Sequence, residues 1–262
     1  MALKFNPRAR LTIQAADLVL ATNSETAARS RVLGATRVEL CLDTAVLSEA
    51  IVHEEREAPG HSAPTVLWVG RNLPLKGVAL ALHAFAHVHR ALPSAQLVML
   101  GGGLDDAATT AQIEALGLVG TVHRLGQVPL PVVIDWYDTS SVMLFSSLRE
   151  SFGVQVLEAM SRGLPVVALD VHGVGDFMPA AAGVKVPLQQ GEGLADALGE
   201  GVIQLLTQPA IWQEASRVAR AEAGRHTWER RAHDLACHFA RLGSARHAGG
   251  SGSHLHPGDT SG

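Results

Sequence analysis

Short apolar runs alternate with amphipathic stretches along the part of the chain that begins at Thr65. Continuous short apolar runs are typical of buried strands, and the stretches between them have helical periodicity. The predicted strands are TVLWVG, QLVMLG, TVHRLG, SVMLF, PVVAL and GVKVP. Strands that alternate with helices predict an α/β fold, with a Rossmann-like parallel sheet that carries helices on both faces.

The same pattern sets the domain boundaries. Residues 1–42 contain about one βαβ unit, with strands predicted at 17–22 and 37–41 and a helix between them that closes at Gly34. Residues 43–64 are polar and contain Pro and Gly, which indicates a linker. Residues 65–226 form the α/β domain, and residues 227–242 form an amphipathic helix. Residues 243–262 are rich in Gly, Ser and His, which predicts a disordered tail.

Composition excludes several classes of protein. Hydrophobic residues make up 47 % of the 262 residues, which is enough for a substantial core. Aromatic residues make up only 4 % and the net charge is −4, which argues against nucleic-acid binding. The two cysteines, Cys41 and Cys237, lie in separate segments and predict neither a disulfide framework nor a metal cluster. We find no signal peptide and no transmembrane run, so we expect a cytoplasmic protein, with peripheral membrane association left open.

Two cations follow the first strand of the α/β domain. Arg71 leaves the strand at its carboxyl end and Lys76 precedes the next helix. Ligands of open α/β sheets bind at this edge, where two cations and helix N–H groups can hold a diphosphate. The alternative is that both are solvated surface cations.

Two carboxylates flank the start of a later helix. Glu150 follows the strand SVMLF, and Ser151 is a candidate cap for the helix that contains Glu158. The backbone of Phe152, Gly153 and Val154 can present N–H groups to a ligand, and Gly153 permits close approach. A carboxylate on this largely apolar helix needs a partner, either a ribose or sugar hydroxyl or Arg162 one turn further on.

Two Gly-rich segments are open to a functional interpretation. The run from Gly101 to Gly103 lacks the spacing of a dinucleotide-binding motif, and we interpret it as a turn that lets the chain pass near a ligand. The segment LDVHGVGDFMP is predicted as a Gly-rich turn at the carboxyl edge of the sheet. In it, His172 and Asp176 either face a ligand cleft or belong to a plain connection.

Taken in order, the segments VGRNLPLKG, LVMLGGG, VHRLGQVP and VMLFSSLRESFGVQVLEAMSRGLPVVALDVHGVG resemble the family 4 glycosyltransferases of the GT-B fold. The resemblance runs from about Ala15 to Leu242. Its signature is the E-x(7)-E pair formed by Glu150 and Glu158, embedded in SLRESFGVQVLEAMSRGLPVVA. The resemblance implies the C-terminal, donor-binding half of a GT-B enzyme that retains the configuration of the transferred sugar.

The resemblance also implies roles for individual residues. Arg71 and Lys76 correspond to the pair that binds the donor diphosphate and offsets charge on the leaving group. Glu158 corresponds to the glutamate that binds the ribose hydroxyls, and Glu150 to the one that contacts the donor sugar. The backbone of Phe152, Gly153 and Val154 covers the sugar and phosphates, and Gly126 and Val128 lie beside the base. No metal and no separate cofactor are implied, because cations and oriented N–H groups can stabilise a diphosphate leaving group.

The chain departs from the family pattern in two places. His172-Gly173 stands where two glycines are common, and Gly175-Asp176 where Pro-Glu is common, which leaves the identity of the sugar open. Residues 1–42 resemble only the last βαβ unit of the N-terminal acceptor domain. We therefore expect an exposed apolar patch near residues 11–42, and expect residues 227–242 to cross back to this unit.

From this resemblance we predict a hexosyltransferase-type glycosyltransferase that uses a UDP- or GDP-linked sugar. The acceptor class stays open among a glycan, a lipid and a small metabolite. A second chain that supplies the missing N-terminal domain is one expected partner. The alternative is a non-catalytic module or subunit that binds a nucleotide sugar. A nucleotide-dependent epimerase with the same fold is a third hypothesis. No nucleic-acid partner is expected.

Overall fold

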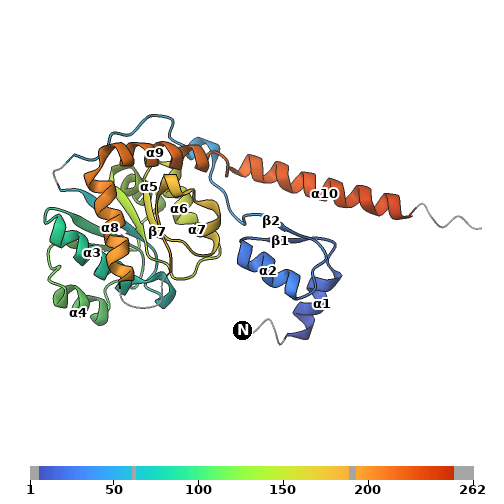
Figure 1. Ribbon diagram of the computed structural model, residues 1–262, viewed down its shortest axis with the longest axis horizontal. Helices are drawn as coiled ribbons and strands as arrows, with labels where there is room; N and C mark the ends of the chain where they lie inside the picture. The colour runs from blue at the N-terminus through green and yellow to red at the C-terminus, as the bar shows by residue number, and fades with distance from the viewer. Residues whose placement is uncertain (1–5, 61–62, 189–192, 251–262) are drawn as a thin grey trace, which may run out of the picture.

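The computed structural model describes residues 6–60, 63–188 and 193–250, with side chains up to Gly243. It shows a large α/β body, a small N-terminal unit and a long C-terminal helix that extends away from the body (Figure 1). Among the described residues, no helix is both long enough and apolar enough to cross a membrane.

The body is built on one six-stranded parallel sheet. Its strands are β3 (Thr65–Val69), β4 (Gln96–Leu100), β5 (Val122–Gly126), β6 (Val142–Phe145), β7 (Val166–Leu169) and β8 (Gly183–Val186). Their spatial order is β5-β4-β3-β6-β7-β8, and every neighbouring pair is parallel. The predicted parallel α/β fold is therefore confirmed. The chain order reverses between β3 and β6, which is the point where ligands bind in such sheets.

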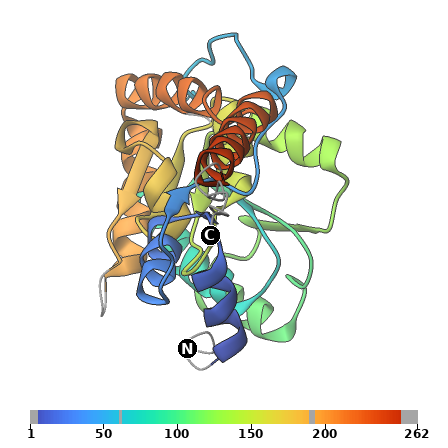
Figure 2. The same ribbon diagram turned by 90° about the vertical axis from the view of Figure 1, so that its right-hand side faces the viewer.

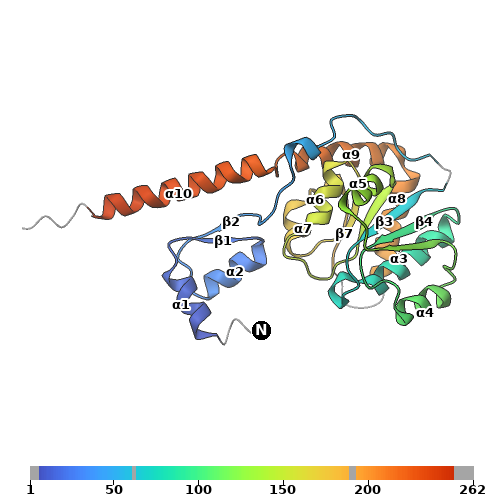
Figure 3. The same ribbon diagram turned by 180° about the vertical axis from the view of Figure 1, so that it is seen from behind.

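Helices cover both faces of this sheet. Side chains of a strand alternate between the two faces, so each apolar strand contributes to a core on either side. Val66 and Trp68 of β3 face a core that includes α3 (Val78–Ala91) and α8 (Leu194–Thr207). Leu67 faces the opposite core, with α5 (Leu130–Thr139) and α6 (Val154–Ser161). The remaining helices of the body are α4 (Ala107–Ala115), α7 (His172–Phe177) and α9 (Pro209–Ala223). Figure 3 shows α5 and α6 from the side opposite to Figure 1.

The prediction that the segment LDVHGVGDFMP is a Gly-rich turn is wrong, because this segment contains helix α7. It folds into a short helix whose buried Val174 and Phe177 lie three residues apart on one face. Glycine is a weak helix former, so Gly173 and Gly175 conceal this helix in the sequence pattern. The packing of the two apolar side chains accounts for the helix.

The N-terminal unit has the predicted βαβ arrangement, preceded by a helix. It consists of α1 (Pro7–Ala15), β1 (Val19–Ala21), α2 (Ser24–Val32) and β2 (Val38–Leu40), with β1 and β2 parallel. The strands are shorter than predicted at both ends. Helix α1 buries none of its residues, and Leu11, Val32 and Leu40 are 63 %, 74 % and 57 % exposed. Apolar side chains are thus exposed in this region, and the expected apolar patch stays a prediction.

The final helix, α10 (Trp228–Gly250), begins at the body and extends away from it past the N-terminal unit (Figures 1 and 2). His238 Nδ1 lies 2.8 Å from the Glu39 carboxylate of β2, so the helix does cross to this unit. It continues past Leu242 to Gly250, so the prediction of a disordered tail is wrong for residues 243–250. Residues 243–250 contain no Pro, so nothing in the backbone stops the helix, although three of them are glycine. Residues 251–262, the rest of that tail, lie outside the described residues.

The segment predicted as a linker is largely irregular, but it is held to the body. It contains one short 3-10 turn, η2 (Ser48–Ala50), and Val46 forms an isolated parallel bridge with Thr227. The Arg56 guanidinium donates to the carbonyls of Tyr137, Asp138, Ser140 and Arg162 at distances from 2.7 to 3.2 Å. Backbone carbonyls at the ends of α5 and α6 are thereby satisfied by one side chain. Residues 61–62 lie outside the described residues.

Candidate functional site

Lys76 and Glu150 meet at the point where the strand order reverses. Lys76 ends the 3-10 turn η3 (Pro74–Lys76) after β3, and Glu150 follows β6. The Lys76 ammonium forms an ion pair with a Glu150 carboxylate oxygen. Their side chains are only 17 % and 21 % exposed, so Lys76 is not a solvated surface cation. Two of the predicted site residues are thus brought together from positions distant in the sequence.

The backbone around Lys76 is held by the segment that follows β6. The Ser146 hydroxyl lies 3.0 Å from the carbonyl oxygen of Lys76 and 2.9 Å from that of Gly77. Gly77 has φ +67°, and a Cβ at this position would lie 2.3 Å from the Ser146 carbonyl oxygen. Only glycine fits this conformation and this close approach. The position of Lys76 is therefore set by the backbone.

Arg71 differs from Lys76, because its side chain is exposed. The backbone of its loop is held by the glycine run after β4. The Asn72 amide N–H donates to the Gly102 carbonyl at 2.9 Å, and the Asn72 side chain donates to the Gly103 carbonyl at 2.9 Å. A Cβ on Gly101 would lie 1.8 Å from the carbonyl oxygen of Gly70. The predicted turn is present, but the close approach made by Gly101 is to the chain itself.

The loop from Glu150 to Val154 reaches the start of α6. Gly153 is the N-terminal cap residue, with φ +92°, and no side chain caps the helix, so the prediction that Ser151 caps it is wrong. The buried Phe152 ring stacks on Phe177 at 4.5 Å, which anchors the loop to α7. The Val156 N–H donates to the Gly153 carbonyl at 2.9 Å, and no side-chain oxygen covers the N–H groups that precede it, so these can bind an anion.

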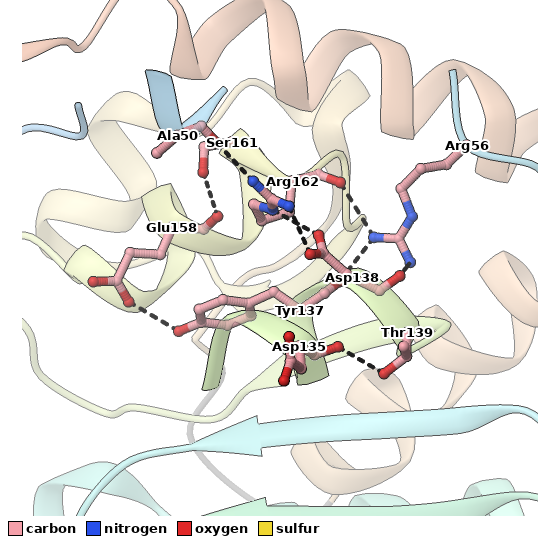
Figure 4. Close-up of polar contacts among 9 residues, drawn as sticks. All are labelled: Ala50, Arg56, Asp135, Tyr137, Asp138, Thr139, Glu158, Ser161 and Arg162. Atoms are coloured by element: carbon pink, nitrogen blue, oxygen red, sulfur yellow. Dashed lines mark hydrogen bonds and ion pairs between the residues drawn. The ribbon is translucent and has the colours of Figure 1, made fainter. Parts of the chain in front are cut away.

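Glu158 is partly buried on α6, and its partner was not predicted (Figure 4). The Tyr137 hydroxyl of α5 donates to Glu158 Oε2 at 3.0 Å. Arg162, the alternative partner, instead binds both carboxylate oxygens of Asp138 at 2.6 Å. Burial raises the pKa of Glu158, and the hydrogen bond from Tyr137 partly opposes this rise. The other carboxylate oxygen, Oε1, can accept hydrogen bonds from a ligand.

Gly126 and Val128 lie further along the same edge of the sheet. Gly126 ends β5, with φ +67°, and Val128 is partly buried against the core under α5 and α6. Because all strands are parallel, the carboxyl end of β5 lies on the same side as those of β3 and β6. Gly126 thus lies at the carboxyl edge of the sheet, two strands away from β3.

His172 and Asp176 both bind the N-terminal unit, and Asp176 also lines a pocket between that unit and the body. His172 Nδ1 lies 2.5 Å from a Glu25 carboxylate oxygen. Asp176 accepts from the Ser24 amide at 2.5 Å and from the Ser24 hydroxyl at 2.8 Å. We call these contacts the α2–α7 clasp. Asp176 places negative charge at the N-terminus of α2, where the helix dipole favours it.

A third contact joins the N-terminal unit to the Glu150 loop. The Asn23 side-chain amide donates to the Ser151 carbonyl at 2.8 Å, while its oxygen accepts from the Thr26 amide and caps α2. Sequence reasoning missed this bond from Asn23 to Ser151. A capping residue at the end of a strand is the only local signal, and it does not name the partner.

We expect Asp176→Ala to loosen the N-terminal end of α2. The exposed carboxylate caps this end, so its loss should cost about 1 kcal/mol. Hydrogen exchange of the Ser24 amide should then become about fivefold faster in the variant. Glu214→Ala, which removes an exposed pair with Arg217 on α9, is the matched control and should leave this amide unchanged. Equal exchange in all three proteins would contradict a stabilising clasp.

Comparison with known proteins places this geometry in a family. The chain is 32 % identical over 179 residues to a D-inositol 3-phosphate glycosyltransferase of Segniliparus rotundus, covering 66 % of this chain and 39 % of the relative. It is 30 % identical over 246 residues to the protein of the same description from Kribbella flavida, covering 85 % and 57 %. The chain thus spans about half the length of these curated relatives.

Solved structures share the fold. Sucrose-phosphate synthase from Thermosynechococcus elongatus superposes with a TM-score of 0.73 at 22 % identity, over 94 % of this chain and 64 % of that one. Anabaena HepE, solved in complex with UDP and glucose, gives 0.74 at 18 % identity, over 92 % and 69 %. The family model described as glycosyl transferases group 1 matches residues 52–226, which include all nine predicted site residues. The chain therefore belongs to the group 1 glycosyl transferases, with the GT-B type of α/β fold.

Proposed function

We propose that the chain supplies the donor-binding half of a retaining family 4 glycosyltransferase that uses a nucleoside-diphosphate sugar. The observation that carries the proposal is the Lys76–Glu150 pair at the reversal point of the sheet, with the first turn of α6 and Glu158 beside it. Lys76 and the uncapped N–H groups match a diphosphate, Glu150 can contact a sugar, and the second carboxylate oxygen of Glu158 can accept from a ribose hydroxyl.

The proposed roles follow from the chemistry of each group. Lys76 and the exposed Arg71 bind the diphosphate, together with the N–H groups at the start of α6. When the bond between the sugar and the diphosphate breaks, negative charge grows on the leaving oxygen, and preorganised cations stabilise that charge. Glu150 contacts the sugar, while Gly126 and Val128 border the base. No metal is required in this arrangement.

The relatives suggest classes of substrate. Curated relatives are described as D-inositol 3-phosphate glycosyltransferases, so a phosphorylated cyclitol is the acceptor class we favour. HepE was solved with UDP and glucose, and this favours a UDP-linked hexose as donor. Transfer is proposed for the whole protein, with the acceptor bound by an N-terminal domain that the present residues represent only in part. The alternative, a module that binds the nucleotide sugar without transferring it, remains an outcome of the tests.

Calorimetric titration of the purified chain with UDP-, GDP- and ADP-linked glucose tests the donor site. We expect micromolar binding of one of these, with the strongest binding identifying the base. Product analysis with inositol 3-phosphate and the bound donor then tests transfer. A folded chain that binds none of the three would refute the proposal, and binding without transfer would support the alternative module.

Glu158→Gln separates a functional from a structural role for this carboxylate. Because burial raises the pKa of Glu158 above that of the unfolded chain, its favourable contribution to stability is lost as the pH rises through the folded-state pKa. At pH 7 the ionised carboxylate therefore opposes folding. Glutamine carries no charge, and its amide oxygen still accepts from Tyr137. We expect the free energy of unfolding at pH 7, measured in urea, to stay constant or rise.

The same variant should bind the nucleoside diphosphate about tenfold more weakly, because a neutral amide is a poorer acceptor for ribose hydroxyls than a carboxylate. Calorimetry measures this change. A variant that is destabilised and binds the nucleotide as well as the unaltered chain would show that Glu158 is structural.

A further inference from the structure

The Tyr137 hydroxyl is the one hydrogen-bond donor from another residue that the described structure places on the Glu158 carboxylate. Tyr137 is 1 % exposed, and its hydroxyl oxygen lies 3.0 Å from Glu158 Oε2 (Figure 4). Burial and the nearby Glu158 charge raise the pKa of Tyr137 well above its ordinary value. The phenol therefore stays protonated and acts as a donor to the carboxylate.

The tyrosine is held in place by contacts that do not involve the site. The neighbouring Asp138 accepts two hydrogen bonds of 2.6 Å from Arg162. Arg162 lies one turn after Glu158, at the end of α6. Arg56 binds the Tyr137 carbonyl at 2.9 Å and the Asp138 carbonyl at 2.7 Å. Burial lowers the pKa of Arg56 to about 10, so it remains charged at neutral pH.

These contacts form a closed ring between two helices. Helices α5 and α6 are joined at one point by the Asp138–Arg162 ion pair and at another by the Tyr137–Glu158 hydrogen bond. The ion pair fixes how the helices lie against each other, so the tyrosine hydroxyl reaches one carboxylate oxygen in a fixed geometry. A carboxylate side chain has three rotatable bonds, and such a contact reduces its freedom before a ligand binds.

We propose that Tyr137 is a positioning residue of the donor site: its hydroxyl occupies Glu158 Oε2 and orients Oε1 toward the ribose diol of the nucleotide. The inference rests on the proposed function. Tyr137 itself does not touch the nucleotide, because it is buried beneath Glu158. Its contribution to binding should therefore appear only when the ligand carries the ribose hydroxyls that the carboxylate accepts.

Tyr137→Phe tests this role, because it removes the hydroxyl and keeps the buried ring. Thr139→Val is the matched control, since its hydroxyl lies on the same helix and donates to the Asp135 carbonyl at 2.7 Å, away from Glu158 (Figure 4). Each protein is titrated with UDP and with 2′,3′-dideoxyuridine diphosphate, or with the GDP or ADP pair if that base binds more tightly.

We expect Tyr137→Phe to weaken binding of the ribonucleotide about five- to tenfold, the size expected for one lost orienting hydrogen bond. Binding of the dideoxynucleotide should change less than twofold, and Thr139→Val should bind both as the unaltered chain does. Equal weakening of both ligands by Tyr137→Phe, or no weakening of either, would overturn the positioning role. If the unaltered chain binds no nucleotide, the proposed function fails and this inference fails with it.

The Glu158→Gln variant distinguishes the two failures. When this variant weakens ribonucleotide binding but Tyr137→Phe does not, the donor site stands and only the role of Tyr137 is refuted. When neither variant changes binding while the unaltered chain binds the nucleotide, the site has been assigned to the wrong carboxylate.

Discussion

Lys76→Ala should lower the affinity for the nucleoside diphosphate about 100-fold, the largest binding loss we expect for a single substitution. The ammonium is mostly buried beside Glu150 at the reversal point of the sheet, so its bonds to a diphosphate would be weakly screened by solvent. A hydrogen bond to a charged group is worth about 1.5–3 kcal/mol, and the upper half of that range corresponds to about 100-fold in affinity. Calorimetry with UDP measures the loss.

The substitution also leaves the Glu150 carboxylate without its cation. This carboxylate would then repel a diphosphate, which adds to the loss. Glu150→Gln should act in the opposite direction on UDP, because it frees Lys76 from a competing anion, and we expect equal or several-fold tighter binding. The two substitutions at one ion pair therefore have opposite expected signs.

Lys185→Ala is the matched control for Lys76→Ala. Lys185 is equally buried, at 18 % exposure, but it lies on the edge strand β8 and binds Asp170 at 3.0 Å and the Gly175 carbonyl at 2.7 Å. Its loss should lower stability slightly and change UDP affinity less than twofold. If Lys76→Ala and Lys185→Ala weaken UDP binding equally, the diphosphate is not bound at Lys76.

The strands of the sheet could be predicted from the sequence because the signal for each is local. Apolar runs such as SVMLF are visible within a few residues, and the parallel order follows from their alternation with helices. That Lys76 and Glu150 lie at the same edge of the sheet could also be predicted, because the carboxyl ends of parallel strands share one edge. Helix α7 was not predicted, because its glycines weaken the helical propensity of the segment and its stability comes from tertiary packing.

The partners of site residues could not be predicted in the same way. Arg162 stands at the i+4 position from Glu158, which favours a pair on one helix, but its Nε and Nη2 donate to the two carboxylate oxygens of Asp138 on α5. The clasp between Ser24 and Asp176, and the bond from Asn23 to Ser151, join residues more than a hundred positions apart. Such pairs depend on how α2 docks against α7, and periodicity contains no information about docking.

Trp212→Ala should cost about 4 kcal/mol of unfolding free energy, the largest stability loss we expect. Trp212 of α9 is 1 % exposed in the core beneath α3 and α8, and its Nε1–H donates to the Ser141 carbonyl at 2.6 Å. Truncating a buried tryptophan typically costs about 3–5 kcal/mol, because it removes buried area and leaves a cavity. The substitution also leaves the Ser141 carbonyl, just before β6, without this donor.

Urea unfolding followed by circular dichroism measures the change, and Trp228→Ala provides the comparison. Trp228 begins α10 and is 44 % exposed, so its loss should cost less than about 1 kcal/mol. Trp212 anchors α9 near the amino end of β6, the opposite end of the sheet from Lys76 and Glu150. Any folded fraction of Trp212→Ala should therefore bind UDP with nearly unchanged affinity. Equal destabilisation by the two substitutions would mean that α9 contributes little to the core, and that the sheet holds the donor site without it.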